Sequence, residues 1–537
     1  MITAGQIAAA SRGHFNLENL DRAALARLRE ILAGSGYCEE NIYKALGIDY
    51  FNMITLQMLP VFLDFRLKDR SPFNAVAKLF LLSQALPGEE VLEALFTSEE
   101  VASLTSMGIL TSERDLISSN VDIYPVMGSF IVTDHHFSNL KFGRSVMYLS
   151  KDSYTLARGT PRKAAGKTLD LCTGSGVQAI LAASHSEHVT GVDINPRAIN
   201  FAEFNKVFNA VENVDFIEGD LFGPLGEEKY DLIVANPPFV PAPAGRQKVF
   251  FRDGGVTGEE VLKRIMGGID RYLADEGKCV IFTEFVQSSE CSYVEKVARW
   301  AGSNFDILAL QGNTVPIELY VIGHLKHDNT FAEYRRKMGE WLVSAYNNAI
   351  TSIAEGLIVC ARPYEGCPSV HRLAKVIMPN RPFPEEVEGL IETLRRSGQG
   401  DAILSYIPCI NSHVRFLWKG RTPEGQEVHL AQFKEESLLK EEELTKEEAD
   451  LLCRMDGRRT LKEVARSAIQ EGAPKTSMED FLTRVKSLAQ KHVIALKNPS
   501  SELMGSIEAT FLLLLIDQPV LQELLDSAGQ IAMNFPM

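Results

Sequence analysis

Clustered cysteines are missing from this sequence. Its eight cysteines are scattered, none forms a Cys-x-x-Cys pair, and no group of cysteine and histidine has the spacing of zinc ligands. We therefore expect no metal site, and we expect the cysteines to be reduced, as in a cytoplasmic protein.

Long hydrophobic segments are missing as well. The longest apolar run near the C-terminus, Phe511 to Ile516, is far shorter than the ~20 residues that a bilayer span needs. The N-terminal segment lacks the basic start and the apolar stretch of a secretory signal. The sequence thus predicts a cytoplasmic protein without a membrane partner.

The sequence also lacks an excess of basic residues. Asp and Glu number 70 against 55 Lys and Arg, which gives a net charge of −15 over 537 residues. A protein of this charge attracts phosphate backbones poorly unless a local basic patch outweighs the global field. The composition disfavours a nucleic-acid partner without excluding it. The length and a hydrophobic fraction of 45% predict about three or four globular domains.

The first part of the chain has helical spacing. Apolar residues recur at helical intervals between residues 20 and 104, with a strong break at Pro87-Gly88. Short helices followed by the alternating segment 122–132 predict a helical, winged-helix-like N-terminal domain over residues 1–118. Such a domain either recognises a substrate or caps an active site, and both interpretations stay open.

A different pattern begins at Lys167. Apolar runs of about five residues alternate with helical stretches, which is typical of an α/β domain with a mainly parallel sheet. The expected strands are 168–172, 189–193, 214–217, 232–235, 279–283, 305–310 and 318–323. Only a short turn separates the last two, so we expect an antiparallel hairpin rather than a parallel pair joined by a helix.

The C-terminal part of the chain is less regular. The pattern predicts a strand over residues 357–361 and a hairpin over 414–418 and 427–433. We assign an α+β extension to residues 327–435. A charged run then leads into a helix, a turn and a second helix, which predict a winged-helix-like module over residues 436–537.

The residues that can carry chemistry follow the expected strands. Where the first strand ends and a helix begins lie Asp170, Cys172, Thr173, Gly174 and Gly176. Glycines let the backbone approach a ligand closely, the helix N-terminus offers N–H groups, and the Asp170 carboxylate suits a cationic group. A Gly-x-Gly after a strand is as often a mere tight turn or a dinucleotide site, so this motif alone decides little.

Acidic residues follow the next two strands. Asp193 lies about 20 residues beyond the glycines, where nucleotide-binding sheets place an acidic residue on the ribose hydroxyls. Asp220 and Leu221 follow the third strand, where an aspartate can accept from an adenine amino group or simply cap a turn. The spacing favours an adenosine-containing ligand, but it does not separate a nicotinamide cofactor from S-adenosylmethionine.

The fourth motif, Asn236-Pro237-Pro238-Phe239, is the most specific. Its two prolines hold the backbone extended and remove two N–H donors, so that acceptors remain: the Asn236 side-chain oxygen and the Pro237 carbonyl. Two acceptors can hold an NH2 group and leave its lone pair available to a methyl electrophile. Phe239 can stack on a planar substrate. These four residues are the candidate catalytic group.

In this order, the segments DLCTGSG, VDINP, GDLF and NPPF resemble the class I S-adenosylmethionine-dependent methyltransferases of the Asn-Pro-Pro-aromatic type. That group includes the glutamine N5-methyltransferases of release factors and ribosomal protein L3, the N6-adenine methyltransferases and the rRNA guanine N2-methyltransferases. The stretch Asp253-Gly254-Gly255 is similar to one in the glutamine enzymes. The segment 149–156 (LSKDSYTL) sits where those enzymes have a loop flanking the cofactor, and the resemblance covers about residues 120–325.

The resemblance implies a Rossmann-like methyltransferase domain over residues 119–326, with S-adenosylmethionine as cofactor. Carried over by position, Asp170, Thr173, Gly174 and Gly176 would line the methionine part of the cofactor, and Cys172 stands in place of the first glycine of that motif. Asp193 would bind the ribose, and Asp220 with Leu221 the adenine. The acceptor would be held by Asn236, Pro237, Pro238 and Phe239.

The expected reaction is methyl transfer to a nitrogen of a protein, a peptide or an amino-acid-like small molecule. Three features favour it: the acidic charge, the Asp-Gly-Gly stretch and a faint similarity of residues 451–496 to winged-helix peptide-binding modules. That segment could also be a generic winged helix, and an oxygen acceptor stays open. A nucleic-acid base is the alternative acceptor, since Phe239 stands where the glutamine enzymes usually have tyrosine. A basic face for it could come from Arg158, Arg162, Lys163, Arg246, Lys248 and Arg252.

Overall fold

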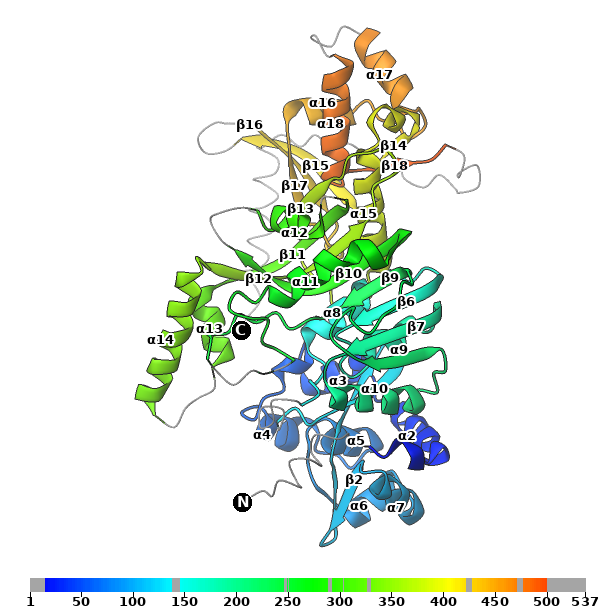
Figure 1. Cartoon of the computed structure of the whole chain (residues 1–537), viewed down its shortest axis with the longest axis vertical. Coiled ribbons are helices and arrows are strands. Elements are labelled where there is room, and N and C mark those ends of the chain that lie inside the picture. The colour runs from blue at the N-terminus through cyan, green and yellow to red at the C-terminus, as the bar shows by residue number, and fades with distance from the viewer. Residues whose placement is uncertain are drawn as a thin grey trace, which may run out of the picture. The chain divides into compact units, whose positions relative to one another are not determined.

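The structure, a computed structural model, describes residues 15–137, 145–245, 249, 251–287, 292–302, 304–325, 330–421, 427–470 and 477–499. Its contacts divide the chain into two units, whose elements are labelled in Figure 1. Unit 1 comprises residues 1–303, 314–360 and 380–384, and unit 2 comprises residues 304–313, 361–379 and 385–537. All residues predicted to bind the cofactor or the acceptor belong to unit 1.

Unit 1 begins with short helices whose ends are set by local capping. The Asp21 side chain accepts from two backbone N–H groups at the start of α2 (Arg22–Gly34). Thr97 and Glu100 exchange side-chain bonds at the start of α7 (Ser98–Ser106). The other elements before residue 120 are η1 (Leu17–Asn19), α3 (Glu39–Leu46), η2 (Phe51–Met53), α4 (Leu59–Val61), η3 (Phe62–Arg66), α5 (Pro72–Phe80), β1 (Leu86–Pro87), α6 (Gly88–Ala94), β2 (Leu110–Glu113) and β3 (Leu116–Ser119). The three strands form a sheet with the order β1-β3-β2.

These helices share one hydrophobic core with the α/β part of unit 1. Phe15 stacks on Phe204 of α10 (Pro196–Phe208), with ring centroids 3.8 Å apart. The hairpin of β4 (Asp122–Val126) and β5 (Ser129–Thr133) is tied to the same helix. The Asn205 side chain accepts from the Val132 N–H at 2.8 Å and donates to the Val132 carbonyl at 2.9 Å. The N-terminal region therefore packs directly against the α/β region.

The α/β part contains the predicted parallel sheet (Figure 1). Its parallel strands are β6 (Ala165–Leu171), β7 (Ser186–Asp193), β8 (Val214–Glu218), β9 (Tyr230–Ala235) and β10 (Leu273–Gln287). Besides α10, its helices are α8 (Lys151–Gly159), α9 (Val177–Ala182), α11 (Glu260–Tyr272) and α12 (Tyr293–Ala301). Within unit 1 the strand order is β12-β10-β9-β6-β7-β8. The order reverses between β6 and β9, and sheets of this kind bind ligands outside the carboxyl ends of their strands at such a switch point. The expected Rossmann-like methyltransferase sheet is confirmed.

One predicted strand is wrong. Residues 318–323, expected as the second strand of an antiparallel hairpin, lie in the helix α13 (Ile317–His324). A short apolar run does not distinguish a strand from a buried helical turn. Here Ile317, Tyr320 and Val321 recur at helical spacing and pack in one buried cluster with residues of α14 (Phe331–Asn347).

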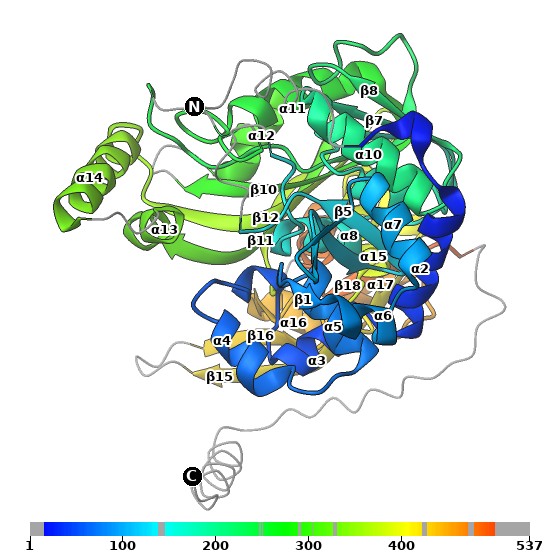
Figure 2. The same cartoon turned by 90° about the horizontal axis from the view of Figure 1, so that it is seen from below.

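The antiparallel strand of the sheet comes later in the chain, as β12 (Ser352–Ala361). The N–H of Thr351, just before β12, donates to the carbonyl of Gln287 at the end of β10, at 3.2 Å. The start of β12 thus lies beside the end of β10, so the two strands are antiparallel. The helices α13 and α14 precede β12 in the chain and lie side by side in both views (Figures 1 and 2).

Among its described residues, unit 2 contains two small sheets and four α-helices. It also contains the strand β11 (Asp306–Pro316), which pairs in parallel with β13 (His371–Lys375). The predicted hairpin is confirmed as β15 (Val414–Arg421) and β16 (Glu427–Phe433), to which β17 (Glu441–Leu444) adds a third strand. The remaining elements are α15 (Pro384–Ser397), η4 (Gly400–Ser405), β14 (Ile407–Ile410), α16 (Lys446–Leu452), α17 (Leu461–Gln470), α18 (Met478–Gln490) and β18 (Ile494–Lys497), with β14 antiparallel to β18.

Across the described parts of both units, no helix combines the length and the apolar character that crossing a membrane requires. The apolar run 511–516 lies outside the described residues.

Candidate active site

The glycine loop after β6 is built from left-handed backbone conformations. Cys172, Gly174 and Gly176 have φ values of 58°, 55° and 82°. A Cβ added at Gly176 would lie 2.8 Å from the ring of Phe216, whereas one at Gly174 would meet nothing nearer than 4.0 Å. The space beside Gly174 is therefore open to a ligand. A left-handed cysteine costs roughly 1–3 kcal/mol, and such strain clusters at binding sites.

Asp170 is the buried carboxylate of this loop, with 1% of the residue exposed. Its Oδ2 accepts from the Thr173 hydroxyl at 2.5 Å and from the Ala179 N–H at 3.0 Å. Its Oδ1 is buried without a hydrogen-bond partner among the described residues. Burial raises the pKa of Asp170 to about 7. A buried acceptor without a donor is costly, so this oxygen fits a cationic ligand group such as the ammonium of S-adenosylmethionine.

Asp193, at the end of β7, connects the second strand to the glycine loop. Its two oxygens accept from the N–H of Gly174 at 2.9 Å and from the N–H of Asn195 at 2.8 Å. Burial raises the pKa of Asp193. A carboxylate has about four acceptor sites, so capacity remains for ribose hydroxyls after these two bonds.

The loop after β8 holds the predicted adenine residues. Asp220 is exposed and forms an ion pair with Arg264 of α11 at 2.8 Å. Leu221 is buried and has a left-handed φ of 50°. An adenine that bound to Asp220 would therefore meet a carboxylate already paired with an arginine.

Asn236 follows β9 and presents the acceptor oxygen that the sequence analysis expected. Its Nδ2 donates to Asp152 Oδ2 at 2.8 Å and lies 3.5 Å from the Ser153 hydroxyl. Its Oδ1 is buried and has no hydrogen-bond partner among the described residues. The adjoining Pro237 is buried. The site therefore contains an oriented acceptor that still lacks a donor.

The Asp-Gly-Gly stretch supports the acceptor motif through backbone contacts. The N–H of Gly254 donates to the Val240 carbonyl at 3.0 Å, and the N–H of Val240 donates to the Arg252 carbonyl at 2.9 Å. A Cβ at Gly254 would lie 2.6 Å from the Pro238 carbonyl oxygen. Only glycine therefore fits at this position, where the stretch packs against the backbone of the acceptor motif.

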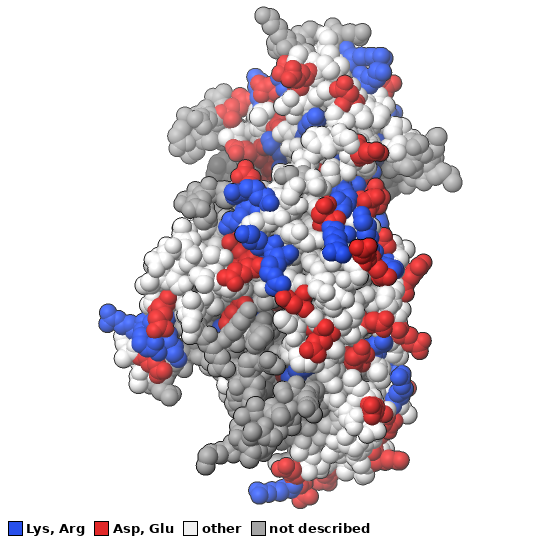
Figure 3. All heavy atoms as spheres, viewed as in Figure 1, with Lys and Arg blue, Asp and Glu red and all other residues white. Residues whose placement is uncertain are grey.

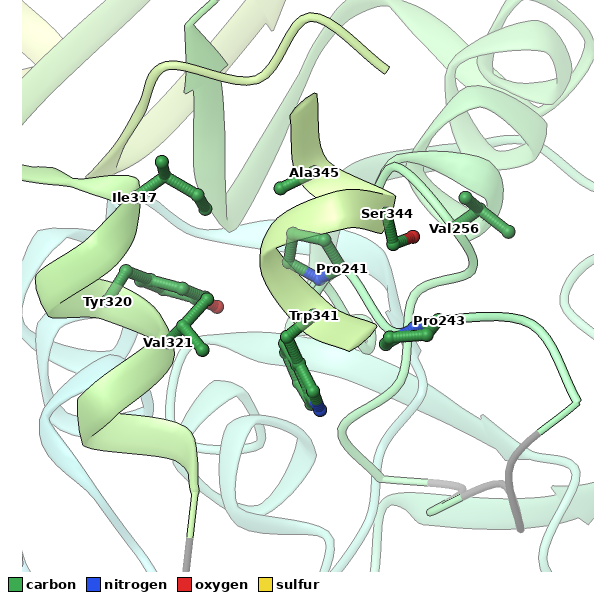
Figure 4. A pocket seen from close by; sticks show the side chains of 9 residues that line it. All are labelled: Pro241, Pro243, Val256, Ile317, Tyr320, Val321, Trp341, Ser344 and Ala345. Atoms are coloured by element: carbon green, nitrogen blue, oxygen red, sulfur yellow. The ribbon is translucent and has the colours of Figure 1, made fainter. Parts of the chain in front are cut away.

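Phe239 ends the acceptor motif and packs toward apolar residues. Its ring centroid lies 5.7 Å from that of Phe282 in β10. A small apolar pocket lies just beyond the motif. Figure 4 shows it lined by Tyr320 of α13, by Trp341 of α14, and by Pro241 and Pro243 of the loop that follows the motif.

A second buried carboxyl group lies near the acceptor site. Glu284, in β10, accepts a hydrogen bond from the Tyr320 hydroxyl. Burial, assisted by the negative charges of Asp152 and Glu355, raises the pKa of Glu284 to about 8. Asp152, which contacts the acceptor asparagine, therefore also interacts electrostatically with a second buried carboxyl group.

The predicted site residues come from the ends of adjacent strands. The glycine loop follows β6, Asp193 ends β7, Asp220 follows β8 and Asn236 follows β9, so the sheet brings all four segments to one edge. The sequence analysis missed the side chains of Asp152, Ser153, Glu284 and Tyr320. The signal that could have found the first two was the segment LSKDSYTL, placed by resemblance beside the cofactor.

Most of the described arginines considered for nucleic-acid binding already have partners within the protein. Arg158 is buried in an ion pair with Glu39, and Arg252 forms one with Asp253 at 2.9 Å. The Arg162 guanidinium donates to the Ala157 carbonyl at 3.0 Å. On the face in Figure 3, basic and acidic side chains are interspersed. Arg246 and Lys248 lie outside the described residues.

Comparison with known proteins identifies the α/β part. A family model described as the methyltransferase small domain matches residues 145–297. The ribosomal protein uL3 glutamine methyltransferase of Bradyrhizobium diazoefficiens is 42% identical in an alignment of 123 residues that covers 21% of this chain and 38% of that protein. The release factor glutamine methyltransferase of Thermodesulfovibrio yellowstonii is 26% identical in an alignment of 240 residues that covers 40% of this chain and 84% of that protein.

A putative protein N5-glutamine methyltransferase of Methanocaldococcus jannaschii is 30% identical in an alignment of 185 residues that covers 33% of this chain and 90% of that protein. The chain spans less than half of the uL3 enzyme named above, 38% of its length. The expected class of enzyme and its cofactor, S-adenosylmethionine, are confirmed by these matches. The chain belongs to the family of S-adenosylmethionine-dependent methyltransferases that includes these glutamine methyltransferases.

Proposed function

We propose that this protein methylates the side-chain amide nitrogen of a glutamine in a protein substrate. The observation that carries the proposal is the buried Asn236 oxygen, which lacks a donor and is held in place by Asp152. An amide NH2 is a donor of the right kind for it. The relatives named above methylate protein glutamine according to their names, which supports the same acceptor here.

The bound cofactor supplies an electrophilic methyl group attached to sulfur. The residues of the chain have to align the acceptor nitrogen with that methyl, and alignment alone can account for much of the rate. We expect the Asn236 oxygen and the Pro237 carbonyl to accept the two N–H bonds of the substrate amide. These acceptors would also stabilise the positive charge that develops on the nitrogen. Phe239 and Phe282 would exclude water from one side.

A nucleic-acid base is the second candidate acceptor. Phe239, in place of the tyrosine usual in the glutamine enzymes, favours it, and the Asn236 oxygen would suit an exocyclic amino group equally well. The net charge of −15 and the pairing of Arg158 and Arg252 with carboxylates count against it.

The flanking regions would serve substrate recognition. The order α5, β1, α6, α7, β2, β3, with the strands paired as β1-β3-β2, supports a winged-helix-like arrangement within residues 1–118. The order α16, α17, α18, β18 supports a similar one within residues 436–537. We place the methyltransferase domain at 119–326 and an extension at 327–435, the latter contributing β12 to the sheet of unit 1. The protein would act in the cytoplasm.

The test is transfer of labelled methyl from S-adenosylmethionine into host extract that is separated into protein, nucleic-acid and small-molecule fractions. Label in protein that is recovered as N5-methylglutamine after digestion, and that is lost with Asn236→Ala, would support the proposal. Label in RNA or DNA would replace it with the second candidate. Normal turnover by Asn236→Ala would show that Asn236 does not hold the acceptor.

A further inference from the structure

Asp152 lies beside the acceptor asparagine and is itself held firmly. The residue is 8% exposed, and its Oδ2 accepts from Asn236 Nδ2 at 2.8 Å. Its Oδ1 accepts from the hydroxyl of Ser150, the residue that precedes α8. Both oxygens of Asp152 are therefore engaged with donors.

The orientation of the Asn236 amide is a chemical problem for the enzyme. The oxygen and the NH2 of a carboxamide have nearly the same size, so the group can turn over with little steric cost. Turned one way it presents an acceptor to the substrate, and turned the other way it presents donors. A substrate NH2 also consists of donors, so the second orientation would oppose binding of the acceptor group.

A carboxylate removes this ambiguity because it can only accept hydrogen bonds. The Asp152 carboxylate therefore selects the orientation in which the Asn236 NH2 faces it and the oxygen faces the opposite side. The Ser153 hydroxyl lies 3.5 Å from the same nitrogen, too far for a strong bond. Asp152 is thus the group that determines the amide orientation.

We propose that Asp152 is the positioning residue of the acceptor site and locks Asn236 in the orientation that accepts from the substrate amide. This rests on the proposed function, since an NH2 acceptor is what makes the orientation matter. Asp152 acts through Asn236 and does not touch the reacting atoms.

The remaining charged groups nearby do not replace Asp152 in this role. Lys151 of α8 pairs with Glu355 of β12 at 2.5 Å. Glu284 of β10 accepts from the Tyr320 hydroxyl of α13. Burial raises the pKa of Glu284 to about 8 and raises that of Tyr320 as well. Among the described residues, Asp152 is thus the carboxylate that accepts from the Asn236 NH2 group.

The experiment exchanges the carboxylate of Asp152 and the amide of Asn236, one at a time and then together, in the full-length protein. Asp152→Asn allows Asn236 to turn over, so we expect kcat to fall by about 10- to 100-fold while the Kd for S-adenosylmethionine is unchanged. Asn236→Asp places two carboxyl groups 2.8 Å apart. They must share a proton, and we expect activity that rises as the pH is lowered.

The double variant, Asp152→Asn with Asn236→Asp, restores one amide and one carboxylate in exchanged positions. The carboxylate that this variant carries at position 236 would accept from the new amide and still offer an oxygen to the substrate. We therefore expect the double variant to be at least tenfold more active than Asn236→Asp at about pH 8 and to lose the acid-side activation. Full activity of Asp152→Asn would overturn the proposal, and so would a double variant no better than Asn236→Asp.

A readout without acceptor separates this proposal from the proposed function. With asparagine labelled by ¹⁵N, the side-chain NH2 signal of Asn236 is identified by its absence in Asn236→Ala. We expect one sharp pair of NH2 proton signals with slow hydrogen exchange in the wild type, and a shifted pair or a second pair in Asp152→Asn. An unchanged signal would contradict the role of Asp152, whatever the acceptor. If the signal behaves as expected but the wild type methylates no glutamine, the proposed function is contradicted and the role of Asp152 is not.

Discussion

Replacing Gly254 with alanine should abolish most methyl transfer while leaving cofactor binding intact. The added Cβ would lie 2.4 Å from the Gly258 carbonyl oxygen, 2.6 Å from the Pro238 carbonyl oxygen and 2.8 Å from Phe239 Cα. Ordinary contacts begin at 3.4 Å, so relief requires movement of about 1 Å. All three atoms belong to the backbone and cannot rotate away as the end of a side chain can. The acceptor motif must therefore shift.

A shift of about 1 Å in a positioning group costs on the order of 100-fold in rate. Overpacking of this kind also costs about 1–3 kcal/mol of stability. We expect turnover of labelled methyl to fall by about 100-fold, whereas the Kd for S-adenosylmethionine, measured by calorimetry, should not change, because none of these atoms belongs to the glycine loop.

The matched control is Gly226→Ala, because a Cβ at Gly226 would meet nothing within 4 Å. It should retain wild-type turnover and stability. If Gly254→Ala turned over as fast as Gly226→Ala, the argument that backbone packing holds the acceptor motif would be refuted. A loss of cofactor affinity equal to the loss of turnover would refute it as well, since the damage would then not be confined to the acceptor side.

Three further predictions concern the buried carboxyl groups. Because burial raises the pKa of Asp170 to about 7, the cationic cofactor should bind more weakly by calorimetry at about pH 6 than at about pH 8, and Asp170→Asn should bind weakly at both. Glu284 has a folded-state pKa of about 8 against an ordinary 4.5, so the folded state holds its proton more tightly. Its contribution to stability is lost as the pH rises through that interval, and Glu284→Gln should lessen this loss in denaturant titrations. Asp193→Ala removes the acceptor of the Gly174 N–H and should weaken cofactor binding by about tenfold or more in the same calorimetric assay.

The parallel sheet could be predicted because its strands carry a local signal. Each of β6, β7 and β9 has most of its buried residues near its carboxyl end, just before a polar motif. The same local signal gave a wrong result for residues 318–323, which we expected to form a strand and which lie in the helix α13. Residues 318–323 are as apolar as a strand, and what makes them a helix is packing against Trp341 and Ala345 of α14, which are distant in sequence. An apolar run this short fits a strand as well as a helical turn, so the local sequence alone does not decide between them.

The candidate site was predictable where a motif sits directly after a strand, as with Asp170, Asp193 and Asn236. Their positions follow from the rule that parallel strands end at one edge of the sheet. Asp152 lay outside that rule because it enters the site from α8, before the first strand of the sheet. Nothing in its local sequence distinguishes a carboxylate that orients an amide from one that caps a helix.

The helix α9 connects the two halves of the site. The Gln178 side chain of α9 donates to the carbonyl of Ser153 at 2.9 Å, and the next residue of α9, Ala179, donates its N–H to Asp170. Asp170, proposed to face the cofactor ammonium, and the segment that carries Asp152, proposed to orient the acceptor amide, are thus fixed to one turn of α9. In methyl transfer the enzyme has to set the distance and angle between two bound groups. A single helical turn that anchors both segments provides that fixed geometry before either group binds.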